Sequence, residues 1–158
     1  MGLDQFFRIR KGLYKSAARG EQVDYPAELD QAFEGDYPGI FGKAASTTTD
    51  YSVGYWRKAN AIHKWFVDNC AGGEDDCHEI EVSVEQLREL YSLCLQVMID
   101  MSRAPELLPT CEGFFFGSEE YDDDYRADIE YTVNLLQKVI PFLEEHGNDY
   151  TAIYQASW

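Results

Sequence analysis

Three segments of the chain repeat their hydrophobic residues with the period of a helix. The first spans residues 54–69 and is predicted to be an amphipathic helix with one apolar face. The apolar positions of this face are Tyr55, Ala59, Ile62 and Phe66.

Two further helices are predicted in the second half of the chain. One begins at Ser83, because Ser83 and Gln86 form the pattern of a capping box ahead of a wide apolar stripe. The other covers residues 118–146, and Pro141 is expected to kink or end its final turns.

Strands are predicted where apolar and polar residues alternate over short runs. Such runs cover residues 3–10, 77–82 and 150–158, and the last of them is expected to pair with the first. The order of elements predicts one α+β domain over residues 1–158, with three main helices packed on a small antiparallel sheet.

Residues 12–52 show no clear period and are rich in Gly, Pro, Thr and acidic residues. We expect an irregular loop region there, which either serves as a functional loop or contains short elements such as a helix over residues 27–33.

Composition and charge exclude several classes of function. The chain has 158 residues, 45% of them hydrophobic, and a formal net charge of −16. That charge disfavours direct binding to nucleic acid and to an anionic membrane surface, because both need cations facing phosphates. The chain contains no run of 18 apolar residues and starts without a signal-like segment, so we expect a cytoplasmic protein.

The acidic excess lies entirely in the second half of the chain. Residues 1–67 hold nine basic and eight acidic residues, whereas residues 68–158 hold four basic and 21 acidic residues. The folded molecule is therefore expected to present an acidic face to a cationic partner.

Several short segments are distinctive when they are taken together. They are Met1–Asp4 (MGLD), 54–66 (GYWRKANAIHKWF), 107–110 (LLPT), 113–118 (GFFFGS), 121–122 (YD) and 154–158 (YQASW). As a set they resemble a family of small acidic proteins encoded by bacteriophages and prophages. The resemblance implies an accessory protein that acts in the cytoplasm of a bacterial host cell, a setting in which such proteins often interfere with host defence. It implies no catalytic residue.

The predicted start of the third helix carries the densest acidic cluster. Acidic residues there stabilise the helix N-terminus, and an acidic, soluble surface would explain several of them. Carboxylates interleaved with tyrosines can also imitate phosphates and occupy the basic groove of a host defence protein, as an anti-CRISPR or anti-restriction protein would. The candidate partner-binding residues are Glu119, Glu120, Tyr121, Asp122, Asp123, Asp124, Tyr125 and Asp128.

An alternative site lies on the predicted helix 54–69. An aromatic ring, an amide, an imidazole and two cations close together could bind a nucleotide or another anionic small ligand, either in a binding protein or in an enzyme. The same residues are also explained as edges of the core and as counterions of the acidic half. The candidate ligand-binding residues are Trp56, Arg57, Asn60, His63 and Lys64.

No metal, cofactor or enzymatic motif is expected. Cys77 and His78 are neighbours on a predicted strand and point to opposite faces, which disfavours a zinc site even with Cys70 nearby. His63 is the main candidate base, and Cys77 or Cys111 a conceivable nucleophile, but no motif brings them together. The cysteines are expected to be reduced thiols.

Overall fold

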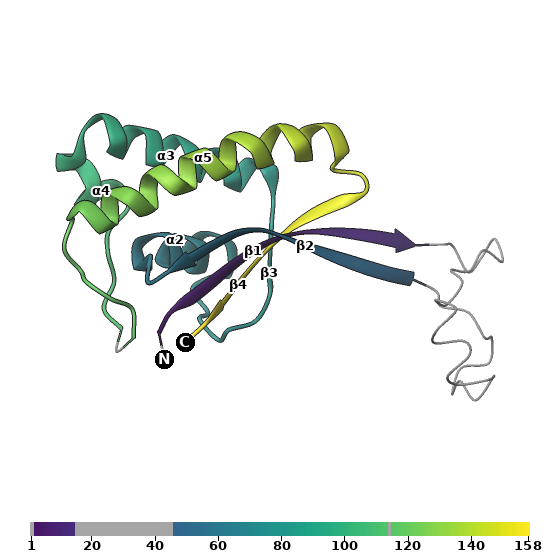
Figure 1. The fold of residues 1–158 in the computed structure, drawn as a ribbon, viewed down its shortest axis with the longest axis horizontal. Helices are drawn as coiled ribbons and strands as arrows, with labels where there is room; N and C mark the ends of the chain where they lie inside the picture. Colours follow the sequence, from purple (N-terminus) through teal and green to yellow (C-terminus); the bar gives the residue numbers. More distant parts are fainter. Residues whose placement is uncertain (1, 15–45, 114) are drawn as a thin grey trace.

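Four antiparallel strands form one sheet in the order β2-β1-β4-β3 (Figure 1). The computed structural model describes residues 2–14, 46–113 and 115–158. The strands are β1 (Asp4–Tyr14), β2 (Ser46–Arg57), β3 (Ile80–Val82) and β4 (Tyr150–Ser157).

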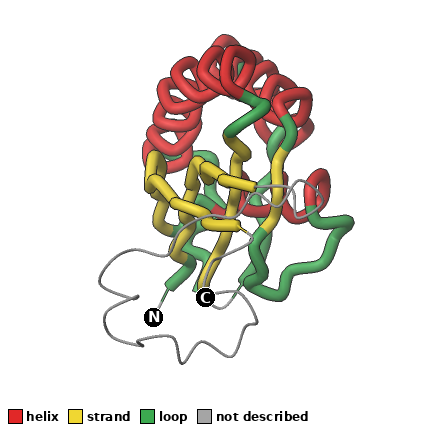
Figure 2. Tube along the Cα trace, turned by 90° about the vertical axis from the view of Figure 1, so that its right-hand side faces the viewer, coloured by secondary structure: helices red, strands yellow, loops and turns green. Residues whose placement is uncertain are grey.

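The helices gather on one side of the strands (Figure 2). Two long helices, α3 and α5, run side by side above the sheet, and together with the sheet they confirm the predicted α+β class. The helical elements in the described residues are α2 (Asn60–Cys70), α3 (Val84–Ile99), the 3-10 turn η2 (Met101–Arg103), α4 (Ala104–Leu107) and α5 (Asp123–His146).

Strand β1 is an inner strand of the sheet because it pairs with β2 on one side and β4 on the other. Asp4 lies opposite Ser157, so the two ends of the chain meet, and the predicted pairing of the last strand with the first is confirmed. Along β1, Phe7 and Ile9 point into the core, whereas Arg8 lies on the opposite face, as the two-residue period of a strand requires.

Aromatic rings join helix α2 to the inner face of the sheet. Phe66 of α2 stacks on Tyr154 of β4 with ring centroids 4.0 Å apart and planes 14° apart. Phe7 and Trp56 contact the same phenylalanine edge-on or tilted. All four side chains are buried, so these rings form the centre of the core.

Helix α3 begins as predicted. The Ser83 side chain accepts a hydrogen bond from the Gln86 N–H, and the Gln86 side chain accepts one from the Ser83 N–H, which completes the capping box. Helix α5 begins at Asp123, five residues later than expected, because Asp122 is its N-cap. The helix also continues past Pro141 to His146, so this proline does not end it.

The prediction of a helix beginning at Gly54 is wrong. Residues 54–57 complete strand β2, and α2 begins at Asn60. Lys58 separates the two elements, because its positive φ of 62° fits neither a strand nor a right-handed helix. The strand expected over 77–82 is also shorter, since β3 begins at Ile80 and Cys77 has a φ of 63°.

The bounds predicted for the irregular region, residues 12–52, are wrong, because strands occupy both of its ends. Strand β1 continues to Tyr14 and strand β2 already begins at Ser46, so these parts are paired strand. Residues 15–45, including the helix considered for 27–33, lie outside the described residues.

Within the described part of the chain, the helices are too short or too polar to cross a lipid bilayer.

A buried hydrogen bond ties α5 to β2 and can be tested. Trp56 Nε1–H donates to Thr132 Oγ1 at 2.9 Å, and both side chains are buried. In Thr132→Val the shape is kept but the indole N–H loses its acceptor, so we expect the free energy of unfolding to fall by about 1–3 kcal/mol. Thr132→Ser retains the hydroxyl and is the control for urea denaturation. Equal stability of the valine variant and the parent would contradict this role.

Candidate acidic cleft at the start of helix α5

A cleft of about 290 Å³ lies between the β2–α2 connection and the start of α5. Arg57, Lys58 and Asn60 line it from the connection. Thr110, Gly117 and Ser118 line it from the loop before α5. The carboxylates that line it are Glu120, Asp122, Asp124 and Asp128. The cleft therefore brings the predicted acidic cluster beside two residues of the alternative ligand set.

The Asn60 side chain fixes the loop that forms the cleft wall. Its Nδ2 donates to the carbonyl oxygens of Phe116 at 3.1 Å and Ser118 at 2.8 Å, and its Oδ1 accepts from the Cys111 N–H at 3.2 Å. Asn60 is 3% exposed, so this amide with all its polar atoms in use serves as an internal clamp.

Gly117 allows the loop to approach the β2–α2 connection closely. It has a φ of 91°, and a Cβ at this position would lie 2.9 Å from the Lys58 Cβ. Both the backbone conformation and the space therefore favour glycine.

Among the described residues, no cation is paired with the acidic side chains at the start of α5. Asp122 accepts the Tyr125 N–H at 3.0 Å as the N-cap, and Asp123 and Asp124 occupy the first turn, where the helix dipole favours negative charge. In the described residues, no ion pair within 4.0 Å joins any of this cluster to a basic side chain; its carboxylates are Glu119, Glu120, Asp122, Asp123, Asp124 and Asp128.

Asp50 and Glu79 differ from this cluster because both are paired with cations. Asp50 and Glu79 are held by Arg8 and Arg10, with Arg10 donating to both carboxylates at 2.6–3.0 Å. The basic residues of β1 thus act as internal counterions on the outer face of the sheet. The same residues are not available to neutralise the start of α5.

Asp128 shows the electrostatic cost of this arrangement. Burial, followed by the negative charges of Asp124 and Asp122, raises the pKa of Asp128 to about 7. At neutral pH this carboxyl is partly protonated, and a cation placed in the cleft would favour its ionised form.

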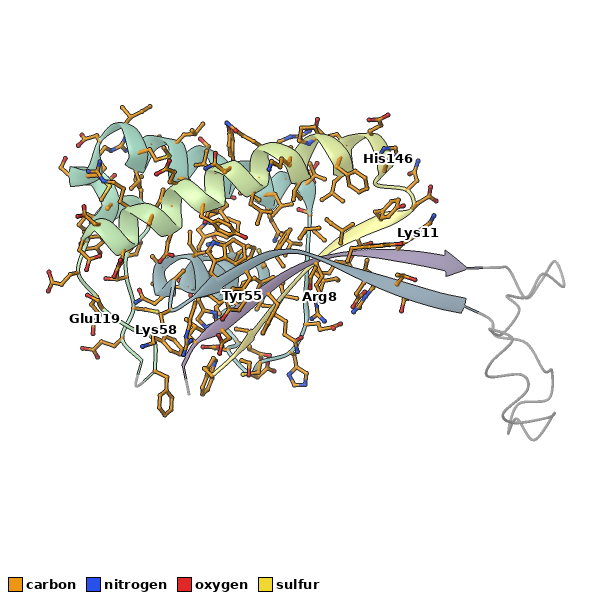
Figure 3. The ribbon with its side chains drawn as sticks, in the orientation of Figure 1. Arg8, Lys11, Tyr55, Lys58, Glu119 and His146 are labelled. Atoms are coloured by element: carbon orange, nitrogen blue, oxygen red, sulfur yellow. The ribbon has the colours of Figure 1, made fainter. Side chains whose placement is uncertain are left out.

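Two cations share the cleft with these acids. Arg57 and Lys58 are exposed, and in the described structure neither makes an ion pair. Lys58 and Glu119 mark the same end of the molecule in Figure 3. With four lining carboxylates against two cations, the cleft retains a negative balance.

The two tyrosines of the predicted interface differ in exposure. Tyr125 is 6% exposed, and its hydroxyl donates to the Leu108 carbonyl at 2.8 Å, so it belongs to the core. Tyr121 is partly exposed, packs edge-on against Tyr125, and accepts the Thr110 N–H at 3.3 Å. Tyr121 is therefore the aromatic ring that a partner can contact.

The alternative ligand residues are not brought together at the surface. Trp56 is a buried strand residue, Asn60 is the internal clamp and Lys64 pairs with Asp68 one turn away on α2. Their expected alignment on one helix depended on the helix starting at Gly54, which is wrong. Arg57 is the member that projects into the cleft from an exposed position.

His63 joins three segments inside the protein. It is 2% exposed, its Nδ1 lies 2.8 Å from the Tyr154 hydroxyl, and its Nε2 lies 3.0 Å from Asp75 Oδ2. Asp75 in turn accepts the Trp158 indole N–H at 3.1 Å. Both imidazole nitrogens therefore have partners inside the protein, and the ring is almost completely shielded from solvent.

The four cysteines are free thiols, and burial raises the pKa of three of them. Burial raises the pKa of Cys70 and of Cys94 to about 12. Burial also raises the pKa of Cys111, whose Sγ lies 3.5 Å from the Asn60 carbonyl oxygen. Thiols with raised pKa values carry little thiolate at neutral pH. Among the described residues, His, Cys, Asp and Glu side chains form no group of three suited to a metal ion.

The sequence contained no signal for the meeting of Arg57 and Lys58 with the acidic cluster. They are separated from Asp122 by more than sixty positions, and no local periodicity links the two segments. Searches with protein-family models, curated sequences and solved structures find no match to this chain.

Replacing His63 tests its structural role. His63→Ala leaves a cavity and removes the partners of the buried Tyr154 hydroxyl and of Asp75, so we expect a loss of about 2–4 kcal/mol in the free energy of unfolding. Tyr154→Phe removes only the hydroxyl and should cost about 1–2 kcal/mol. Chemical denaturation measures the stability of both variants. An unchanged stability of His63→Ala would show that the contacts of His63 with Tyr154 and Asp75 do not stabilise the fold.

The raised pKa of Asp128 predicts a specific pH dependence. The folded protein retains the Asp128 proton at pH values where the unfolded chain has lost it, so this residue makes stability fall as pH rises from about 4 to 7. Asp128→Asn cannot ionise, and we expect it to be more stable than the parent at pH 8 by about 1–2 kcal/mol, allowing for solvent screening.

At pH 4 the difference should be small. Thermal unfolding at both pH values measures it, with Asp149→Asn as an exposed control. A gain of equal size at pH 4 would mean that ionisation of Asp128 is not the cause.

Proposed function

We propose that this protein is a non-catalytic binding protein that holds basic side chains of a protein partner at the start of helix α5. The observation that supports this most directly is the absence of ion pairs, within the described residues, for the carboxylates that surround the cleft. Arginine or lysine side chains of a partner would supply the missing charge.

The shape of the site suits protruding cations. A cleft of about 290 Å³ accepts one or two long side chains, while Glu119 and Asp123 remain exposed outside to contact neighbouring positive groups. Partly exposed Tyr121 adds an apolar contact of the kind that anchors protein interfaces.

We extend the proposal to the kind of partner. A row of carboxylates that faces a basic protein surface competes with the phosphates of a nucleic acid. Given the resemblance to phage-encoded acidic proteins, the partner we propose is a nucleic-acid-handling defence protein of the bacterial host, which the bound protein inhibits in the manner of an anti-CRISPR or anti-restriction protein.

The test is an amide variant in which Glu119, Glu120, Asp122, Asp123 and Asp124 become Gln or Asn. Asparagine retains the N-cap at position 122, so the fold is preserved. We expect capture of a basic partner from bacterial lysate to be lost, with the partner identified by mass spectrometry. Capture by the parent should weaken steeply as salt rises, because exposed charges are screened.

A matched control removes the same amount of charge elsewhere. Its five substitutions to amides fall on the exposed residues Glu74, Glu81, Glu89, Glu145 and Asp149. The control should retain capture. If both variants bind equally well, or both lose binding equally, the start of α5 is not the specific interface.

A further inference from the structure

A second concave surface lies farther along α5, between this helix and strand β2. It has a volume of about 530 Å³ and is lined mainly by apolar side chains. We call it the β2 groove and define it by Tyr51 and Val53 of β2 and by Leu135, Lys138, Val139 and Phe142 of α5. Tyr51, Val53 and Phe142 are 49%, 40% and 36% exposed, which is high for such side chains beside one another.

The groove borders an open edge of the sheet. Strand β2 is the outermost strand, and within the described residues no strand pairs with its outer side. Near the end of β2, the Tyr55 N–H donates to the Tyr131 hydroxyl at 3.1 Å, so this position is covered. The preceding residues 48–53 contain no proline or lysine, the residues that commonly protect an edge strand.

The backbone of β2 and the side chains of the groove together determine which kind of ligand this surface can bind. An open strand edge offers N–H and C=O groups to an extended backbone, and side chains that alternate on such a strand point to one face. Gly54 lets β2 lie close to α5, because a Cβ there would be 2.5 Å from Leu135 Cδ2. A strand added beside residues 48–53 would thus place every second side chain towards the groove.

Charge indicates whether the β2 groove binds a second copy of the chain or a different protein. A net charge of −16 on each copy opposes self-association. Lys138 is the sole charged residue in the groove lining and makes no ion pair in the described structure. An extended segment with apolar residues at alternate positions and one acidic residue facing Lys138 is complementary to this surface.

We propose that the β2 groove binds such an extended segment of a partner protein as an added strand on the edge of β2. This surface is separate from the acidic cleft. In Figure 3, Lys58 and Glu119 mark the cleft end of the molecule, and Lys11 and His146 mark the opposite end.

The experiment uses the whole protein and a display library of random peptides of about twelve residues. Selection is carried out at about 0.5 M salt, where exposed charge contacts such as those of the acidic cleft are screened. We expect enriched peptides with apolar residues at every second position. N-methylation of alternate peptide nitrogens on the bonded side should abolish binding, and N-methylation on the other side should not.

Two variants and one control locate the site. Val53→Arg and Phe142→Glu change exposed groove positions and should each weaken peptide binding by at least about ten-fold, since each removes an apolar contact. Ile99→Arg changes a side chain that is 86% exposed at the end of α3 and should leave affinity within about two-fold.

Several outcomes would overturn the proposal. They are enrichment of no peptide that depends on Val53 or Phe142, enrichment of peptides with helical spacing, and a dimer of the free protein that Val53→Arg dissociates. Because selection takes place at high salt and the amide variant of residues 119–124 retains the groove, failure here is distinguishable from failure of the acidic cleft.

Discussion

The packing of helix α2 on the inner face of the sheet determines the rest of the structure. Its centre is the parallel stack of Phe66 on Tyr154, with ring centroids 4.0 Å apart. This contact positions two other residues of α2. His63 forms a hydrogen bond with the Tyr154 hydroxyl, and the amide of Asn60 holds the loop before α5. The cleft wall is therefore fixed by the core.

The acidic cleft combines a favourable and an unfavourable electrostatic arrangement. Asp122, Asp123 and Asp124 are stabilised by the N-terminus of α5. Asp128 follows one turn later, where burial and the negative charges of Asp124 and Asp122 raise its pKa. A bound cation would relieve this repulsion, so the electrostatic cost in the free protein becomes part of the attraction for a basic partner. Repulsion of this kind is typical of sites that bind a ligand, since it destabilises the fold of the free protein.

The sequence predicted those elements whose signals are local. The capping box at Ser83 and the pairing of the chain's two ends both occur as expected, because capping depends on a few neighbouring residues and the alternation of the end strands is clear. The end of β2 was taken for helix because Tyr55 and Ala59 have helical spacing with Ile62. Tertiary pairing with β1 determines the strand there, and the unusual φ of Lys58 gave no sign in the sequence.

The candidate site was predicted in its parts but not as a whole. The acidic cluster was visible as composition, whereas the cleft needs Arg57 and Lys58 to lie beside residues distant in sequence, which only the folded chain achieves. Burial also separates Tyr125 from Tyr121, although both are tyrosines in one acidic segment. Side-chain burial depends on the packing of α4 and α5, and the pattern of residues in one segment does not determine it.

The most direct measurement is an NMR titration of the isotopically labelled protein with a short arginine-rich peptide at low salt. The account predicts that the largest amide shift changes fall on residues 117–128 and on Arg57 and Lys58, with little change around Glu144 and Asp149. Shift changes spread evenly over all acidic surfaces, or centred on the C-terminal end of α5, would contradict a specific cation-binding cleft.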